Sequence, residues 1–221
     1  TTTMDWMPQE RERGITITSA ATTCSWKDHQ INIIDTPGHA DFSYEVSRGL
    51  TACEGAILVV DATQGIQAQT LANVYSALER DIEIIPVVNK IDAQMAEPDR
   101  VVNEMVQALG FQAKDVLRIS ALDGTGIPAL LEAIIARVPP PRGEVNAPLR
   151  ALIFDSTYDL YKGVVAYVRV RDGNIRLGSR TRLMGNGVLA TVQEVGVFHP
   201  QLEQVGQLEA GEVGPRGKAA P

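Results

Sequence analysis

Three short apolar runs, separated by segments with helical spacing, constrain the fold of this chain more than any other feature. The runs cover residues 56–60, 84–88 and 116–119. None of them alternates between apolar and polar side chains, which is typical of strands buried on both faces of a parallel sheet. The intervening segments carry apolar residues at helical intervals, for example Val101 and Met105. Strands that alternate with helices predict a doubly wound α/β domain with a mostly parallel sheet.

Polar residues follow directly after apolar runs at three places in the chain. Asp35, Asn89 and Ser120 each come just after such a run. In doubly wound folds, ligands bind at the carboxyl ends of the strands. The sequence therefore predicts a ligand site at this edge of the sheet.

The motif Asn89-Lys90-Ile91-Asp92 predicts a guanine nucleotide as the ligand. The carboxylate of Asp92 can accept two parallel hydrogen bonds from the ring N–H and the exocyclic amine of guanine. Adenine lacks this edge, so ATP would leave a buried acceptor unpaired. We expect the Lys90 stem to lie along the base and Asn89 to brace neighbouring loops. Asn and Asp also favour helix N-caps, but the apolar run directly before the motif favours the guanine site.

A second segment, Ser120-Ala121-Leu122, follows the last apolar run of the α/β domain. The backbone amide of Ala121 is well placed to donate a hydrogen bond to the carbonyl oxygen of guanine. By itself the segment is a weak signal. We interpret it as cofactor-binding only as the partner of Asp92.

The motif Asp35-Thr36-Pro37-Gly38-His39 indicates the phosphate side of the same site. The carboxylate of Asp35 would orient the shell of a magnesium ion. The amide of Gly38 can reach the terminal phosphate, because glycine lets the backbone approach closely. Asp-x-x-Gly alone is a common turn, but its pairing with Asn-Lys-x-Asp favours a nucleotide switch.

Two further residues are candidates for the chemistry of this site. A lone histidine is usually a capping or core residue, but His39 directly follows the phosphate-facing glycine, so we expect it to position the attacking water. Thr16 lies in Arg13-Gly14-Ile15-Thr16-Ile17. It could be an ordinary strand threonine, but its hydroxyl is a suitable magnesium ligand in a switch segment.

The sequence contains no Gly-x-x-x-x-Gly-Lys-Ser/Thr motif, and only 34 residues precede Asp35. That motif forms the loop that cradles the phosphates in such folds. We therefore expect an incomplete G domain, cut at its N-terminus, that binds nucleotide weakly and hydrolyses little.

Consecutive prolines at residues 139–141 end the last predicted helix. We predict a GTP-binding domain over residues 1–140, a proline-rich linker over 141–147 and a small antiparallel β-barrel over 148–221. Turn signals such as Asp172-Gly173 separate the segments of this second domain. Its expected strands cover residues 149–154, 163–170, 180–184 and 190–197.

Composition limits the class of protein and its partners. The 221 residues are 44% hydrophobic and carry a net charge of −7, which argues against broad electrostatic binding to nucleic acid. Two cysteines fit neither a disulfide framework nor zinc spacing, so a reducing cytoplasm is expected. No apolar run approaches the roughly 20 residues that span a bilayer.

Taken together, the motifs at 13–17, 35–39, 89–92 and 120–122 resemble those of the translational GTPase family. Within that family, residues 43–214 resemble the elongation factor 4 (LepA) branch. The segments 4–7 and 15–41 look closer to elongation factor G. The branch pattern continues after residue 214 as an apolar strand, whereas this chain reads Pro-Arg-Gly-Lys-Ala-Ala-Pro, which puts the last strand of the barrel in doubt.

This resemblance implies a ribosome-binding GTPase that uses GTP, GDP and Mg²⁺ and acts in translocation or back-translocation. It also implies a cytoplasmic monomer with peripheral association at the membrane. The nearest alternatives are an elongation factor G-like or ribosomal protection GTPase. A different alternative is a non-catalytic module that binds the ribosome or a nucleotide without turnover.

Overall fold

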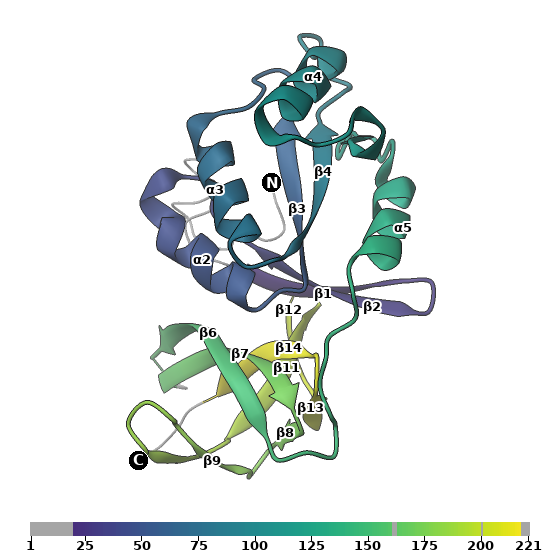
Figure 1. Ribbon diagram of the computed structural model, residues 1–221. Coiled ribbons are helices and arrows are strands. Elements are labelled where there is room, and N and C mark those ends of the chain that lie inside the picture. Colours follow the sequence, from purple (N-terminus) through teal and green to yellow (C-terminus); the bar gives the residue numbers. More distant parts are fainter. Residues whose placement is uncertain (1–19, 161–162, 200, 218–221) are drawn as a thin grey trace. The chain divides into compact units, whose positions relative to one another are not determined.

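The computed structural model describes residues 20–160, 163–199 and 201–217 (Figure 1). The predictions for Thr16 and for the segment 4–17 fall outside these described residues. No helix within the described ranges is both long enough and apolar enough to cross a bilayer.

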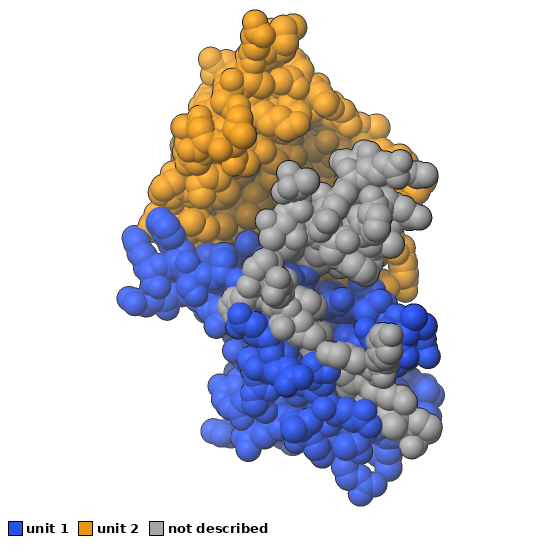
Figure 2. Space-filling model, turned by 180° about the vertical axis from the view of Figure 1, so that it is seen from behind, with its two compact units in different colours: residues 1–37, 140–221 blue, residues 38–139 orange. Residues whose placement is uncertain are grey.

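The chain divides into two compact units, which are coloured separately in Figure 2. Residues 38–139 form the first, called here the α/β unit. Residues 1–37 and 140–221 form the second, called here the β unit. This division groups the N-terminal hairpin with the C-terminal strands, so the boundaries at residues 140 and 148 stay a prediction.

The α/β unit alternates strands with helices, as the apolar runs predicted. Its elements are η1 (Ala40–Phe42), α2 (Ser43–Thr51), β3 (Gly55–Asp61), α3 (Ala68–Leu78), β4 (Glu83–Asn89), α4 (Pro98–Leu109), η2 (Ala113–Asp115), β5 (Leu117–Arg118) and α5 (Ile127–Arg137). The first two strands extend the predicted runs by one residue at each end. The third is shorter than predicted, because only Leu117 and Arg118 pair with β4.

The three strands of this unit lie in the order β3-β4-β5 and run parallel. Gly55 pairs with Glu83 at one end of β3 and β4, and Asp61 pairs with Asn89 at the other. The carboxyl ends of the strands therefore meet at one edge, and the polar residues that follow them are neighbours.

Helices cover both faces of this sheet (Figure 1). On one face, Val88 packs with Met105 of α4, and Ile84 packs against α3. On the other face, Ile85 packs with Leu130 of α5. Burying one such side chain contributes roughly 1.5–3 kcal/mol. The predicted doubly wound α/β architecture is confirmed.

Glycines lie at the ends of two helices of the α/β unit. Helix α4 begins at Pro98 and is followed by Gly110, whose φ of +74° is left-handed. Gly126 precedes α5 with φ +75°, and a Cβ there would lie 2.3 Å from the carbonyl oxygen of Arg118. Only glycine fits this position without displacement of the backbone.

Strands β1 (Ala20–Trp26) and β2 (His29–Asp35) form a hairpin of the β unit. They pair antiparallel from Ala20 with Asp35 to Trp26 with His29. Lys27 in the connecting turn has φ +52°, as hairpin turns of this kind require. The hairpin places Asp35 at the end of β2.

The remaining strands of the β unit pair antiparallel. They are β6 (Arg150–Asp159), β7 (Gly163–Asp172), β8 (Asn174–Arg176), β9 (Arg180–Arg182), β10 (Leu189–Thr191), β11 (Glu194–His199), β12 (Gln201–Gln204), β13 (Gln207–Glu209) and β14 (Val213–Gly217). Five of them form a sheet in the order β12-β11-β14-β7-β6, while β9 pairs with β10 and β8 with β13. The antiparallel β domain that the sequence predicted is confirmed.

Two details of the β unit differ from the predicted strands. The run 190–197 is not one strand: it divides into β10, which pairs with β9, and β11, which pairs with β12 and β14. The segment that departs from the branch pattern still forms a strand, since β14 includes Pro215 and pairs with both β7 and β11.

The segment before β6 is hydrogen-bonded to the end of β7 within the β unit. The amide of Gly173 donates to the carbonyl of Glu144 at 2.8 Å, and the amide of Glu144 donates to Asp172 Oδ1 at 3.2 Å. A Cβ on Gly143 would lie 2.0 Å from the carbonyl oxygen of Arg171. The chain therefore runs in direct contact with the end of β7.

Candidate functional site

Backbone hydrogen bonds hold together two loops at the carboxyl edge of the parallel sheet. The amide of Ile119 donates to the carbonyl of Val88 at 2.8 Å, and the amide of Ile91 donates to the carbonyl of Ile119 at 3.3 Å. The loop after β4 and the loop after β5 are thus fixed to each other. These are the two loops that carry the predicted base-reading motifs.

The side chain of Asn89 joins the two motifs directly. Its Oδ1 accepts hydrogen bonds from the amide of Lys90 at 2.7 Å and from the amide of Ala121 at 3.0 Å. The donation of the Ala121 amide to the base stays a prediction, and in this structure the amide donates to Asn89. Asn89 therefore braces the loop of Ala121, in the manner that the sequence analysis expected of it.

The loop that begins at Ser120 is a tight turn. The amide of Gly124 donates to the carbonyl of Ser120 at 2.9 Å, and the amide of Ser120 donates to the carbonyl of Thr125 at 2.9 Å. Hydrogen bonds from Thr125 lower the pKa of the exposed Asp123 carboxyl. Ser120 itself is fully buried, whereas Leu122 is 85% exposed. Ser120 thus anchors the loop, and Leu122 projects into solvent.

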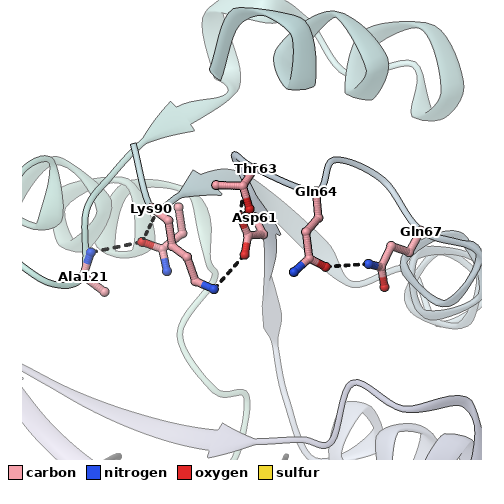
Figure 3. Close-up of polar contacts among 7 residues, drawn as sticks. Asp61, Thr63, Gln64, Gln67, Lys90 and Ala121 are labelled. Carbon is pink, nitrogen blue, oxygen red and sulfur yellow. Dashed lines mark hydrogen bonds and ion pairs between the residues drawn. The ribbon is translucent and has the colours of Figure 1, made fainter. Parts of the chain in front are cut away.

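Lys90 adopts an unusual backbone conformation at this edge. Its φ of +64° is left-handed, which costs an ordinary side chain about 1–2 kcal/mol. Its ammonium Nζ lies 2.7 Å from Asp61 Oδ2 (Figure 3). Asp92, two residues further on, is exposed and available to a ligand.

Asp61 is a site residue that the sequence analysis missed. Its Oδ1 accepts hydrogen bonds from the amide of Thr63 at 2.8 Å and from the Thr63 hydroxyl at 2.7 Å. Burial alone would raise the pKa of Asp61, but the hydrogen bonds from Lys90 and Thr63 and the charge of Lys90 lower it to about 2. Asp61 is therefore ionised at neutral pH. Its place at the end of an apolar run, like that of Asn89, was the signal that could have identified it.

The residues predicted for the phosphate side lie in different parts of the chain. Asp35 ends strand β2 in the β unit, whereas Gly38 and His39 begin the α/β unit. The Nδ1 of His39 lies 3.4 Å from Asp41 Oδ2 and accepts a hydrogen bond from the amide of Asp41 at 3.3 Å. Within the described residues, no three His, Cys, Asp or Glu side chains gather as a metal site.

Comparison with known proteins identifies relatives of the chain. A model of the family described as "Elongation factor Tu GTP binding domain" matches residues 1–140. Elongation factor 4 of Dehalococcoides mccartyi is 57% identical over 216 residues, which cover 96% of this chain and 36% of that protein. Elongation factor 4 of Synechocystis sp. is 55% identical over the same length, and that of Clostridium botulinum is 54% identical over 219 residues. The chain spans 36% of the length of each of these relatives.

Two solved structures share the fold. The bacterial selenocysteine-specific elongation factor EF-Sec superposes with a TM-score of 0.78 at 24% identity, covering 96% of this chain and 37% of that one. A structure from Thermus thermophilus superposes with a TM-score of 0.83 at 18% identity, covering 99% of this chain and 47% of that one. The match over residues 1–140 shows that the chain belongs to the family of the elongation factor Tu GTP binding domain, and its similarity to elongation factor 4 is the one that the motifs predicted.

Proposed function

We propose that the carboxyl edge of the parallel sheet is the guanine-binding site of a ribosome-associated translational GTPase of the elongation factor 4 type. The observation that carries this proposal is the hydrogen bond from the Ala121 amide to Asn89 Oδ1, at 3.0 Å. It joins the loop of Asn89, Lys90 and Asp92 to the loop of Ser120. These loops follow adjacent parallel strands, where doubly wound folds bind nucleotides.

Each residue of the two loops has a proposed part in binding the base. Asp92 accepts hydrogen bonds from the N–H groups of guanine, and the Lys90 stem covers the base. Asn89 and Ser120 hold the loops in place, while Leu122 flanks the site. Ala121 offers its amide to the carbonyl oxygen of guanine as a shared donor that also keeps its hydrogen bond to Asn89 Oδ1. Discrimination against adenine follows, because Asp92 would be left unpaired.

The residues proposed to serve the phosphates and Mg²⁺ are Thr16, Asp35, Gly38 and His39. The hydroxyl of Thr16 and the carboxylate of Asp35 are hard oxygen donors of the kind that Mg²⁺ prefers, and either can hold the ion directly or through water. When bound, Mg²⁺ neutralises negative charge on the phosphates. The Gly38 amide contacts the terminal phosphate, and His39 orients the water that attacks it.

The proposed partner is the ribosome, and GTP hydrolysis is coupled to translocation or back-translocation. Identities of 54–57% to elongation factor 4 support this type over an elongation factor G-like or ribosomal protection GTPase. The proposed location is the cytoplasm. Peripheral membrane association and a monomeric state stay predictions of the resemblance.

The base specificity of the purified chain tests this proposal first. We expect fluorescent GDP, titrated in the presence of Mg²⁺, to bind and to be displaced by GTP but not by ATP. As a matched control, Glu83→Gln removes an ion pair with Arg137 at the opposite end of β4 and should leave binding unchanged. If a cooperatively folded chain binds no GDP, or releases it equally to ATP, the proposal is wrong.

Hydrolysis is tested separately, at His39. In a chain extended with an upstream phosphate loop, ribosome-stimulated release of phosphate from GTP should fall about 10²- to 10⁴-fold in His39→Ala, because a positioned group of this kind contributes that much. His29→Ala is the matched control, since His29 is an exposed histidine in the hairpin β1–β2. Equal turnover in both variants would remove His39 from the mechanism. Guanine-selective binding without any turnover would instead favour a non-catalytic nucleotide-binding module.

A further inference from the structure

The strained backbone at Lys90 indicates a functional contact. Three non-glycine residues in the described part of the chain have positive φ. Lys27 lies in a hairpin turn and Asp81 follows helix α3, and a positive φ is ordinary at such places. Lys90 instead directly follows a buried parallel strand. Strain at such an edge persists only where surrounding contacts hold it, and it is characteristic of ligand sites.

Two contacts hold Lys90 in this conformation. At the backbone, the amide of Lys90 donates to Asn89 Oδ1 at 2.7 Å. At the far end of the side chain, Nζ pairs with Asp61 Oδ2 at 2.7 Å. The four-carbon stem between them is thus fixed at both ends, although the side chain is 58% exposed. An exposed lysine held in this way has lost rotamer freedom before any ligand arrives.

Asp61 is itself firmly placed. Its side chain is 18% exposed, and the amide and hydroxyl of Thr63 hold the carboxylate oxygen that does not face Lys90. Figure 3 shows Thr63 and Lys90 on different sides of this carboxylate. The other end of the same loop is fixed too, since the amide of Ile66 donates to Glu104 Oε2 on α4 at 3.2 Å. Asp61 therefore presents a rigid, ionised acceptor to Lys90.

We propose that Asp61 is a positioning residue of the guanine site, which acts by holding the Lys90 stem in its base-covering conformation. The inference rests on the proposed function, because it assumes that Lys90 covers the base. Binding a nucleotide would otherwise require Lys90 to give up its rotamer freedom at that moment, and this lowers affinity. The same ion pair keeps the ammonium at Asp61, so that Lys90 contributes its apolar stem to the base.

A double-mutant cycle on nucleotide affinity tests this inference. We expect Asp61→Asn to weaken fluorescent GDP binding about 3- to 10-fold, the range for ordering one long side chain. The asparagine retains an oxygen acceptor for Thr63, so the loop stays folded. Lys90→Met keeps an apolar stem and removes the ammonium. Adding Asp61→Asn to Lys90→Met should cause no further loss, because Asp61 acts through Lys90.

A second readout reports the ion pair without any nucleotide. Acetylation by a small anhydride, followed by mass spectrometry, should modify Lys90 more slowly in the wild type than in Asp61→Asn. The exposed Lys27 and Lys114 serve as internal references, and their rates should not change between the two proteins. A change in stability alone would alter all three lysines together. Equal rates at Lys90 in both proteins would overturn the inference.

The outcomes separate this inference from the function on which it rests. If the wild type binds GDP selectively and Asp61→Asn binds it equally well, the guanine site stands and the positioning role is wrong. Additive losses in the double variant also overturn the role, because Asp61 would then act independently of Lys90. If the folded wild type binds no GDP, the proposed function fails and the inference fails with it. Glu83→Gln should match the wild type in every assay.

Discussion

Each compact unit has an ion pair at the end of a strand, and the two pairs differ in what they connect. In the β unit, Arg150 Nε lies 2.5 Å from Asp172 Oδ2, and these residues are direct partners in the antiparallel register of β6 and β7. In the α/β unit, Asp61 ends strand β3 and Lys90 directly follows the parallel strand β4, and the chain crosses a helix between them. The first pair reinforces one ladder. The second joins the ends of two strands that are distant in sequence.

The comparison explains why the loops proposed to bind the base gather in the α/β unit. Parallel strands must be joined by crossovers, so their carboxyl ends collect loops from distant parts of the sequence. Antiparallel strands are joined by short turns, and polar groups there contact their own neighbours. The apolar cores of the two units are alike in composition, with Met105 in one and Ile175 in the other fully buried. The two units differ instead in the contacts that polar residues make at the ends of the strands.

The largest expected effects test whether the cores are equivalent. Met105→Ala and Ile175→Ala each leave a cavity at a side chain that is 0% exposed, so each should lower the free energy of unfolding of its unit by about 2–5 kcal/mol. Hydrogen exchange resolved by peptide measures both units in one experiment. A loss below about 1 kcal/mol in one unit alone would show that the cores are packed differently.

Next in size is a comparison of two glycines with positive φ. Gly126 has φ +75° and Gly178 has φ +79°, but only at Gly126 would a Cβ meet backbone, the carbonyl oxygen of Arg118 at 2.3 Å. We expect Gly178→Ala to lower the free energy of unfolding by about 1 kcal/mol through strain. Gly126→Ala should lower the free energy of unfolding by clearly more, because the loop of Ser120 must also move. Thermal melting checks this, and equal costs would contradict the tight turn.

The smallest expected effect on stability is at Asp61 and depends on pH. The pKa of Asp61 is lowered from 3.8 to about 2, so its ion pair stabilises the folded state above pH 4 and is lost as the pH falls toward 2. Asp61→Asn should therefore cost about 1 kcal/mol at pH 7, a value reduced by solvent screening because Lys90 is exposed. In urea unfolding, the free energies of unfolding of the wild type and the variant should converge near pH 2. A difference independent of pH would exclude the ion pair as its cause.

Asp172→Asn tests the corresponding ion pair in the β unit. The hydrogen bond from Arg150 lowers the pKa of Asp172, so its variant should lose stability with the same sign of pH dependence. Because the pair in the β unit joins only one ladder, we expect no change in GDP affinity. A loss of affinity in Asp172→Asn would break the distinction between the two ion pairs.

Local sequence patterns predicted the elements well and the contacts between them poorly. The runs 56–60 and 84–88 were recognised as strands because a buried parallel strand has a continuous apolar signal. Asp61 was missed because its contact with Lys90 depends on which strands are neighbours in the sheet. The hydrogen bond from the Ala121 amide to Asn89 Oδ1 was missed for the same reason. The division of 190–197 into two strands also depends on pairing, because β10 pairs with β9 and β11 pairs with β12 and β14.

The most direct test of the central claim is the base preference of Asp92→Asn. The wild type should prefer GDP over xanthosine diphosphate. In the variant, one acceptor oxygen becomes a donor, so the preference should shift toward xanthine by about tenfold or more. Asp99→Asn is the matched control, since Asp99 is another exposed aspartate of the same unit, and it should behave as the wild type. An unchanged base preference in Asp92→Asn would contradict the claim that this edge of the sheet reads guanine.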